Sequence, residues 1–214
     1  MELLTQISES LMRGENDRVG ELTRQAIADG IEAKQILDDG LIAGMAVVGE
    51  RFKAHDIFLP EVLLAARAMY AGMDELKPLL IKEGIPSLGK VVIGSVQGDL
   101  HDIGKNLVGI MLRGAGYEVI DLGNDVAPER FVETAKAEDA PLIGMSALLT
   151  TTMPVMKKVV ELLRERGLQD RIRTVIGGAP VNADFADEIG VDAYAFDGVN
   201  AVERCKGLIG LDAR

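Results

Sequence analysis

The chain has 214 residues, 48% of them hydrophobic and 27% charged, so it can bury a core as one large domain or as two smaller ones. Its net charge of −11 divides into −6 over the first 88 residues and −5 over the rest, which argues against nucleic-acid binding through phosphate contacts. No apolar run approaches the roughly 18–20 residues of a membrane span, and the first residues lack the pattern of a signal peptide, so we expect a cytoplasmic protein that does not bind a membrane.

Hydrophobic residues recur with helical spacing over about the first 83 residues. A first helix is expected over about residues 2–13, and three further apolar faces follow it. These faces consist of Val19, Leu22, Ala26 and Ile27; of Leu41, Met45, Val48 and Phe52; and of Val62, Ala66, Met69, Met73 and Leu76. The pattern predicts an N-terminal four-helix bundle.

Residues 83–89 contain two glycines and a proline and are predicted to form a linker, after which the hydrophobic period changes. We expect strands at Lys90–Val96, Glu118–Asp121, Leu142–Ser146, Thr174–Ile176 and Ala193–Phe196, with helices near residues 103–114, 128–138, 153–167, 182–189 and 199–208. This alternation is typical of a parallel sheet with right-handed crossovers. The predicted fold class is α/β: a four-helix bundle over residues 1–88, then a Rossmann-like (flavodoxin-like) parallel five-stranded sheet with flanking helices over residues 89–214. Cys205, the single cysteine, is expected to be a small buried hydrophobe on the last helix.

The loop after the first predicted strand carries one of the two histidines in the chain, His101, two residues after Asp99. Open α/β sheets bind ligands in such loops. A metal-bound imidazole usually donates its other N–H to a carboxylate, which raises its basicity. His101 is therefore a candidate axial metal ligand tuned by Asp99. Taken alone, a histidine in such a loop is more often a hydrogen-bonded residue that binds no metal, so the assignment depends on the motifs that follow.

Three motifs in chain order resemble those of cobalamin-binding proteins that hold the corrinoid base-off with histidine on cobalt. They are D-x-H-x-x-G at Asp99, His101 and Gly104; S-x-L at Ser146 and Leu148; and G-G at Gly177 and Gly178. Methionine synthase, some mutases and some photoreceptors share this series. Met45–Phe52 and Phe58–Val62 are in addition similar to the helical cap of methionine synthase and of small corrinoid proteins of methyltransferase systems. Together the two resemblances cover nearly the whole chain.

The glycines around His101 fit this resemblance better than they fit a phosphate-binding loop. Gly94, Gly98 and Gly104 would let a large flat macrocycle lie close to the backbone. A P-loop needs four residues between its glycines, whereas five separate Gly98 from Gly104, and Asn106 stands where Ser or Thr is required. The acidic side chains of the loop would also repel phosphate. Nucleoside triphosphate binding is therefore disfavoured.

The resemblance implies specific roles in the second half of the chain. His101 would be the lower axial ligand of cobalt. Ser146 could hydrogen-bond Asp99 and complete a Ser-Asp-His relay, although Ser146 alone is compatible with a turn or cap residue. The same motif lines the pocket of the displaced dimethylbenzimidazole tail, where Thr150 matches another contact. The Gly-Gly pair would let the nucleotide tail pass a strand end, and Gly198 is a weaker match at a position where the family has a small residue, usually Ala, after the last strand.

In the helical cap, Phe52 and Leu59 align with side chains that cover the upper face of the corrin, and Val62 is their expected neighbour. Ordinary helix packing is the alternative for these residues. His55 lies between them in the sequence and is a candidate for the upper cobalt position in a resting Co(III) state. The full set of expected cofactor-binding residues is Phe52, Leu59, Val62, Gly98, Asp99, Leu100, His101, Asp102, Gly104, Ser146, Leu148, Thr150, Gly177, Gly178 and Gly198, with His101 on the metal.

The resemblance implies a corrinoid methyl carrier, itself non-catalytic, in a multi-component methyltransferase system. Its cofactor would be cobalamin or a related corrinoid that accepts a methyl group on Co(I) from a substrate-specific methyltransferase. Methyl-Co(III), as in methylcobalamin, would then pass the group to a second methyltransferase, with tetrahydrofolate or coenzyme M as acceptor. A reductive activation protein would reduce inactive Co(II) back to Co(I). A B12-dependent sensor, a small mutase subunit and a flavodoxin-like nucleotide binder are the alternatives. The sequence leaves the methyl donor open among methanol, methylamines, methylated betaines and phenyl methyl ethers.

Overall fold

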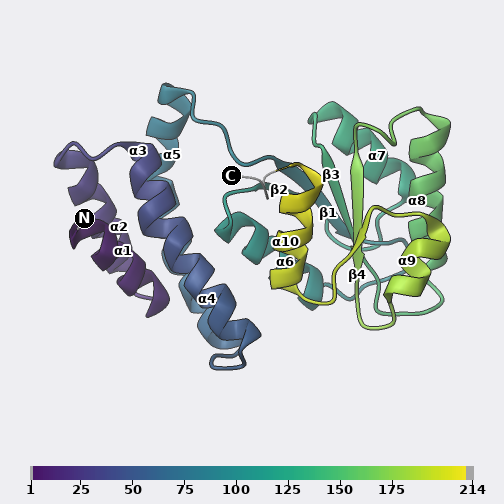
Figure 1. Cartoon of the computed structure of the whole chain (residues 1–214), viewed down its shortest axis with the longest axis horizontal. Coiled ribbons are helices and arrows are strands. Elements are labelled where there is room, and N and C mark those ends of the chain that lie inside the picture. Colours follow the sequence, from purple (N-terminus) through teal and green to yellow (C-terminus); the bar gives the residue numbers. More distant parts are fainter. Residues whose placement is uncertain (1, 211–214) are drawn as a thin grey trace. The chain divides into compact units, whose positions relative to one another are not determined.

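A computed structural model describes residues 2–210 of the chain, which divide into two compact units (Figure 1). The helical unit runs up to Ser87 and includes Gly114–Gly116, and the sheet unit comprises Leu88–Arg113 and the chain from Tyr117 onward. Among the described residues, no helix combines the length and apolar character that crossing a bilayer requires.

The helical unit contains the four predicted helical segments. They are α1 (Glu2–Met12), α2 (Asn16–Ala28), a continuous segment made of α3 (Ala33–Gln35), η1 (Ile36–Ile42) and α4 (Ala43–Lys53), and α5 (Leu59–Glu83). The apolar faces meet in a core of fully buried side chains that includes Ile7, Leu11, Leu22, Ile36, Leu41, Met69 and Leu76. The expected helical N-terminal region is confirmed.

The third helical segment contains a π-helical stretch, η1, that a 3.6-residue period does not predict. A Cβ added to Gly40 of η1 would lie 3.2 Å from Cγ2 of Ile7 in α1. A glycine at this position therefore lets two helices approach closely while the hydrogen-bond pattern widens by one residue.

The sheet unit is a five-stranded, all-parallel sheet in the order β2-β1-β3-β4-β5. Its strands are β1 (Lys90–Ser95), β2 (Glu118–Asp121), β3 (Leu142–Ser146), β4 (Arg173–Gly177) and β5 (Ala193–Tyr194). The order reverses between β1 and β3, which is the flavodoxin-like arrangement with its topological switch point between these two strands. The predicted α/β fold class is confirmed.

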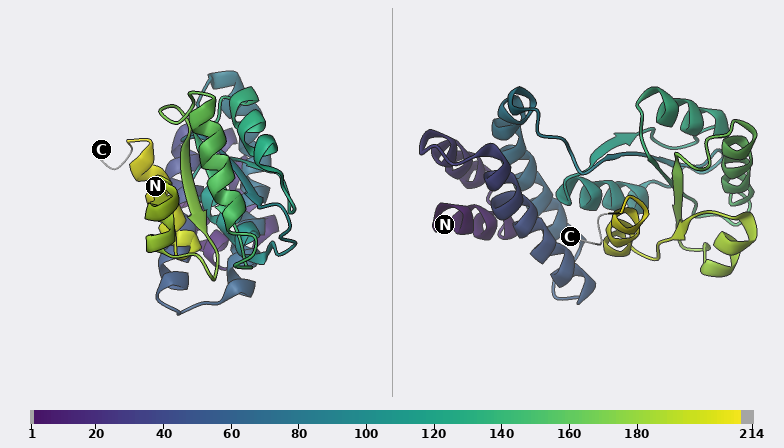
Figure 2. Two further views of the ribbon diagram at one scale, coloured as in Figure 1. Left: turned by 90° about the vertical axis from the view of Figure 1, so that its right-hand side faces the viewer. Right: turned by 45° about the horizontal axis from the view of Figure 1, so that its top comes forward.

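Five helices cover the two faces of the sheet. They are α6 (Ile103–Gly114), α7 (Pro128–Ala137), α8 (Pro154–Glu165), α9 (Ala183–Ile189) and α10 (Gly198–Leu208). Helices α6 and α10 lie on one face, while α7, α8 and α9 lie on the other (Figures 1 and 2). The core on the second face includes Phe131, Ile143, Met156, Val159 and Ile176, all at most 1% exposed. Cys205 is buried on α10, as expected, and burial raises the pKa of its thiol to about 12.

The last strand is shorter than predicted. The sequence indicated a strand over Ala193–Phe196, but β5 ends at Tyr194, and Phe196 is exposed. Ala195 N–H still donates to the carbonyl of Ile176, but β4 ends at Gly177, and the carbonyl of Gly178, which would be the next to face β5, accepts the N–H of Val181 instead. The ladder therefore has no acceptor on β4 for a longer β5.

Candidate functional site

The loops that follow β1 and β3 lie together at the carboxyl edge of the sheet, at its switch point. Ser95 and Ser146, the last residues of these strands, are register partners, and Val96 N–H donates to the carbonyl of Ser146 at 3.0 Å. Each connection leaves its strand in a different direction at this point, which opens a crevice for ligands in folds of this type. The structure thus brings the His101 loop and the Ser146–Leu148 motif side by side.

Asp99 and His101 form the hydrogen-bonded pair that the sequence predicted. Oδ1 of Asp99 lies 2.8 Å from Nδ1 of His101 and also accepts the backbone N–H of His101 at 3.1 Å. Because an ionised carboxylate can only accept, Nδ1 carries a proton, and in the neutral imidazole the free lone pair is then on Nε2. The His101 side chain is 53% exposed, whereas that of Asp99 is fully buried. The buried Asp99 carboxylate therefore orients the imidazole, while more than half of the His101 side chain is accessible to solvent.

The second carboxylate oxygen of Asp99 is held by the segment after β3. Oδ2 accepts N–H groups from Leu148 at 2.7 Å and Leu149 at 3.2 Å, and the hydroxyl of Thr152 at 2.9 Å. Burial by itself raises the pKa of this carboxyl, but hydrogen bonds from Leu148, from His101 and from Thr152 outweigh it and hold the pKa of Asp99 well below its usual range. The carboxylate is thus ionised while buried.

The predicted hydrogen bond from Ser146 to Asp99 is wrong. Within the described part of the chain, no such bond joins the two residues, and the hydroxyl that reaches Asp99 belongs to Thr152, which is 7% exposed. Ser146 is the last residue of β3, paired with Gly177, whereas the groups that donate to Oδ2 of Asp99 belong to the segment that follows the strand. The sequence offered one signal that was missed: Thr152 is the last of three consecutive threonines just before α8.

The two glycines of the G-G motif were expected to leave room for a nucleotide tail at the end of β4, but both lie against other parts of the protein backbone. Gly178 has φ of +123°, and a Cβ there would lie 1.9 Å from the carbonyl oxygen of Ala147; a Cβ on Gly177 would lie 2.9 Å from that of Ala195. Gly178 therefore lets the β4 turn approach Ala147, in the segment after β3 that holds Asp99, whereas Gly177 lets β4 approach the backbone that follows β5. Their missing side chains are needed by the fold itself, and any contact with a nucleotide tail stays a prediction.

The remaining predicted glycines divide into open and buried positions. No atom lies within 4 Å of a Cβ added to Gly104, and Gly98, with φ of +85°, meets only Thr152 at 3.3 Å. Gly94 was expected to expose backbone to a macrocycle, but this is wrong, because a Cβ there would lie 2.8 Å from the ring of Phe131 in the core. Gly198 is also buried, and a Cβ added to it would lie 3.3 Å from Cγ of Met111 in α6; it follows Asp197, whose carboxylate caps α10.

Exposed apolar side chains lie at the same edge of the sheet as the accessible imidazole. Five large hydrophobic residues that follow β1, β3 and β5 are between 41% and 73% exposed: Leu100, Ile103, Leu148, Leu149 and Phe196. The carboxyl ends of parallel strands share one edge, so these five residues, which we call the apolar rim, lie at the edge of the sheet that carries His101. Such a rim fits a large, flat, largely apolar ligand.

The site offers a single imidazole, which suits a metal whose other coordination positions are already filled by a macrocycle. In residues 2–210 there is no group of three or more His, Cys, Asp or Glu side chains arranged to hold a metal ion. A single imidazole cannot hold a bare ion tightly, but it can complete the coordination of a macrocyclic metal complex, whose ring occupies the other positions. Of the other predicted contacts, Thr150 is exposed and Asp102 half-buried, both beside this rim in the chain.

The predicted residues of the helical unit differ in accessibility. Phe52 and Leu59 are half-buried and His55 is exposed, in a left-handed conformation with φ of +61°. Val62 has no exposed surface, so its expected contact with a corrin is not available in this structure and its side chain packs in the bundle. For Phe52, Leu59 and His55 the roles implied by resemblance stay predictions.

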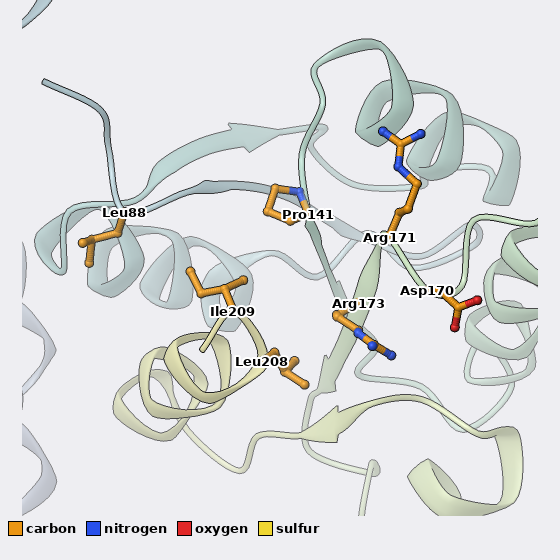
Figure 3. Close-up of a pocket in the computed structure, with 7 residues that line it drawn as sticks. All are labelled: Leu88, Pro141, Asp170, Arg171, Arg173, Leu208 and Ile209. Carbon is orange, nitrogen blue, oxygen red and sulfur yellow. The ribbon is translucent and has the colours of Figure 1, made fainter. Parts of the chain in front are cut away.

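A separate pocket of about 390 Å³ lies at the opposite, amino edge of the sheet (Figure 3). It is lined by Leu88, Pro141, Asp170, Arg171, Arg173, Leu208 and Ile209, which precede or begin strands or end α10. Its two arginines already pair with Asp139 and Asp192. The pocket contains no residue of the predicted site.

Comparison with known proteins agrees with this geometry. A family model described as a B12 binding domain matches residues 89–206, and a second B12 binding domain model matches residues 3–77. The chain is 44% identical over 209 residues to a dimethylamine corrinoid protein of Methanosarcina barkeri, covering 97% of this chain and 98% of that protein. It is 41% identical over 213 residues to a corrinoid protein of Desulfitobacterium hafniense, covering 98% and 99%.

A solved structure is similar over nearly the whole chain. It is the methanol:cobalamin methyltransferase complex of Methanosarcina barkeri, with a TM-score of 0.88 and 35% identity, covering 98% of this chain and 80% of the matched one. Both units of the present chain thus have counterparts in B12-binding proteins. The sequence, the paired Asp99 and His101 and these matches lead to one conclusion: the chain belongs to the family of B12-binding corrinoid proteins of methyltransferase systems.

Proposed function

We propose that the protein carries methyl groups on a corrinoid whose cobalt is bound by Nε2 of His101, with the benzimidazole tail detached. The observation that carries this proposal is the 2.8 Å contact between Nδ1 of His101 and the buried carboxylate of Asp99. This contact selects the tautomer in which Nε2 can bind a metal, and the half-exposed imidazole is within reach of a large ligand.

The residues near His101 would make different contacts with the cofactor. The apolar rim of Leu100, Ile103, Leu148, Leu149 and Phe196 would bury the ring and exclude water from it. Gly104 leaves space for close approach to the first turn of α6. The bound corrinoid supplies methyl transfer at cobalt, cycling between Co(I) and Co(III), while the protein binds, orients and tunes it.

Asp99 would tune the metal through the imidazole. Its buried negative charge draws the Nδ1 proton and makes Nε2 a stronger donor. Five hydrogen bonds hold the carboxylate, three of them from Leu148, Leu149 and Thr152, so it keeps its charge and position whether or not a ligand is present. Asp99 is thus a positioning residue rather than a ligand.

The carrier role requires partners. We propose a substrate-specific methyltransferase as donor partner, a second methyltransferase that passes the methyl group to an acceptor such as tetrahydrofolate or coenzyme M, and a reductive activation protein. Relatives with different named methylamines are nearly equally similar: 44% identity to a dimethylamine and 40% to a trimethylamine corrinoid protein. Identity alone therefore does not select the methyl donor. None of the relatives reported above supports a sensor or a mutase subunit, and the cytoplasmic location stays an expectation.

Spectroscopy of the reconstituted protein tests the proposal. The protein is loaded with cobalamin, reduced to Co(II) and studied by electron paramagnetic resonance, with nitrogen-15 histidine in one sample. The expected spectrum shows coupling to one histidine nitrogen, and the His101→Ala variant loses it. His55→Ala is a matched control, because His55 is the other histidine in the chain and should leave the coupling intact. Coupling that persists in His101→Ala would overturn the assignment.

A further inference from the structure

Four backbone polar groups of the His101 loop are held by residues that lie outside the three recognised motifs. Gly98 N–H donates to Oδ1 of Asp125 at 2.7 Å, and Asp125 N–H donates to the carbonyl of Asp99 at 3.0 Å. The side-chain amide of Asn124 donates to the carbonyl of Leu100 at 3.2 Å. The segment after β2 therefore forms hydrogen bonds with the three consecutive residues that precede His101, Gly98 to Leu100.

A buried hydroxyl completes this arrangement. Ser95, at the end of β1, is fully buried, and its Oγ donates to the carbonyl of His101 at 2.6 Å. Buried polar groups of this kind are usually paired, and a paired group cannot move without breaking its bond. The carbonyl groups of Asp99, Leu100 and His101 thus each have a donor outside the loop.

The conformation of Asp125 sets this residue apart. Its φ of +52° is in the left-handed region, which a residue other than glycine adopts at a cost unless the surroundings hold it there. In this conformation both its carboxylate and its backbone N–H point at the same peptide segment, Gly98–Asp99. A residue that accepts strain while making two bonds to one loop is a candidate for a positioning role.

The loop that carries Asp125 is itself anchored to the helix that follows His101. Lys105 on α6 is 4% exposed and pairs with both carboxylate oxygens of Asp121, at 2.7 and 2.6 Å. Asp121 in turn accepts the N–H of Gly123 at 2.9 Å. The two loops are therefore connected at both ends, once through Asp125 and once through this ion pair.

We propose that Asp125 is a positioning residue for His101, which fixes the Asp99–His101 loop before any ligand binds, with help from Asn124 and Ser95. This proposal rests on the proposed function, since it assigns a role toward the same imidazole. A loop that is ordered beforehand loses less conformational freedom when it binds a ligand. Removing the Asp125 carboxylate should therefore lower the fraction of cofactor that has histidine on the metal. The corrin contacts themselves would stay, because Asp125 is not part of the apolar rim.

Two variants of Asp125 separate the carboxylate from the backbone conformation. Asp125→Gly removes the acceptor for Gly98 but suits the positive φ, so the fold should persist. Asp125→Asn keeps an oxygen acceptor, and asparagine tolerates the left-handed region. We expect the glycine variant to lower the ratio of histidine-on to histidine-off Co(II) by on the order of tenfold, and the asparagine variant to restore it.

A matched control uses a second aspartate with the same backbone conformation. Asp139 has φ of +51° in the turn before β3, at the opposite edge of the sheet. Asp139→Gly changes the same atoms in the same conformation, yet it should leave the Co(II) spectrum unchanged. Asn124→Ala, which deletes only the bond to Leu100, should shift the ratio in the same direction as Asp125→Gly.

A measurement without cofactor tests the loop directly. In the protein free of corrinoid, hydrogen exchange of the Gly98 amide should accelerate about tenfold in Asp125→Gly and return toward wild type in Asp125→Asn. If wild type shows histidine coupling but Asp125→Gly matches it in both the ratio and the exchange rate, the positioning role is wrong while the proposed function stands. If wild type shows no histidine coupling, the proposed function fails, and the positioning role fails with it.

Discussion

The hydroxyl of Thr152 donates to Oδ2 of Asp99 at 2.9 Å, while the other oxygen of the same buried carboxylate holds the imidazole of His101. Fifty-three residues separate the donor from the acceptor along the chain, and the two come together because β1 and β3 are neighbours in the sheet. Together with the N–H groups of Leu148 and Leu149, this contact links the loop after β3 to the orientation of His101.

Replacing Thr152 by valine should destabilise the protein, because valine keeps the shape but leaves a buried carboxylate oxygen with one donor fewer. We expect the free energy of unfolding to fall by about 1.5–3 kcal/mol, measured by urea denaturation of the protein without cofactor. Thr152→Ser should recover most of the loss. Thr151→Val, at the exposed neighbouring position, should change stability little. Equal stability of Thr152→Val and wild type would show that the bond contributes nothing.

Asp99→Asn should weaken the bond between His101 and cobalt by favouring the other imidazole tautomer. The three donors from Leu148, Leu149 and Thr152 require the amide oxygen of asparagine to face them, which turns the amide NH₂ toward Nδ1 of His101. Nδ1 must then accept, and Nε2 carries the proton. Histidine coupling in the Co(II) spectrum should fall, with a roughly 10–100-fold effect on affinity or methyl transfer. A spectrum and a Co(II)/Co(I) potential like those of wild type would contradict this.

Alanine substitutions at Gly104 and Gly178 should separate a role toward the cofactor from a role in the fold. Gly104→Ala has open space and lies in the first turn of α6, so it should leave stability unchanged or raise it by up to about 1 kcal/mol. Its added methyl group should nevertheless lower corrinoid affinity about tenfold, because Gly104 is exposed and lies three residues after His101 in the motif expected to bind the cofactor. Isothermal titration with cobalamin and urea denaturation measure the two effects. Unchanged affinity would remove Gly104 from the binding surface.

Gly178→Ala is the contrasting case. Its Cβ would lie 1.9 Å from the carbonyl oxygen of Ala147, at a φ that L-residues rarely adopt, so we expect a loss on the order of 3 kcal/mol or more before any cofactor is added. Urea denaturation of the cofactor-free variant tests this. Full stability of Gly178→Ala would mean that the close approach of β4 to the segment after β3 is not a constraint.

Cys205 should resist alkylation in the native protein. Burial raises the pKa of its thiol to about 12, so its thiolate fraction near pH 8 is roughly a thousandfold or more below that of an unfolded chain. The raised pKa means that the neutral thiol contributes its full stability below about pH 8.5 and that this contribution declines as the pH rises toward 12. Iodoacetamide kinetics should accelerate with pH up to about 12 in the folded protein, but level off above about pH 9 in urea. Equally fast native and unfolded reaction at pH 8 would contradict this.

Local patterns in the sequence were sufficient for the order of the secondary structure and for the central pair of the site. The strands Glu118–Asp121 and Leu142–Ser146 and the helix Ile103–Gly114 have the predicted bounds, because hydrophobic periodicity records burial on one face or both. The Asp99–His101 hydrogen bond was also predictable, since it spans two residues and needs only the turn of one loop.

Contacts between distant segments were decided by the tertiary structure alone. Three consecutive threonines precede α8, but it is the register of β1 against β3 and the turn before α8 that make Thr152, and not Ser146, the donor to Asp99. In the same way, the sheet places β1 between β2 and β3. Only for this reason does Gly94 face Phe131 and does the carboxylate of Asp125 accept the N–H of Gly98. The sequence by itself determined which residue types stand near His101, and the tertiary structure decided which of their atoms meet, because a hydrogen bond depends on positions within a few tenths of an ångström that no sequence spacing specifies.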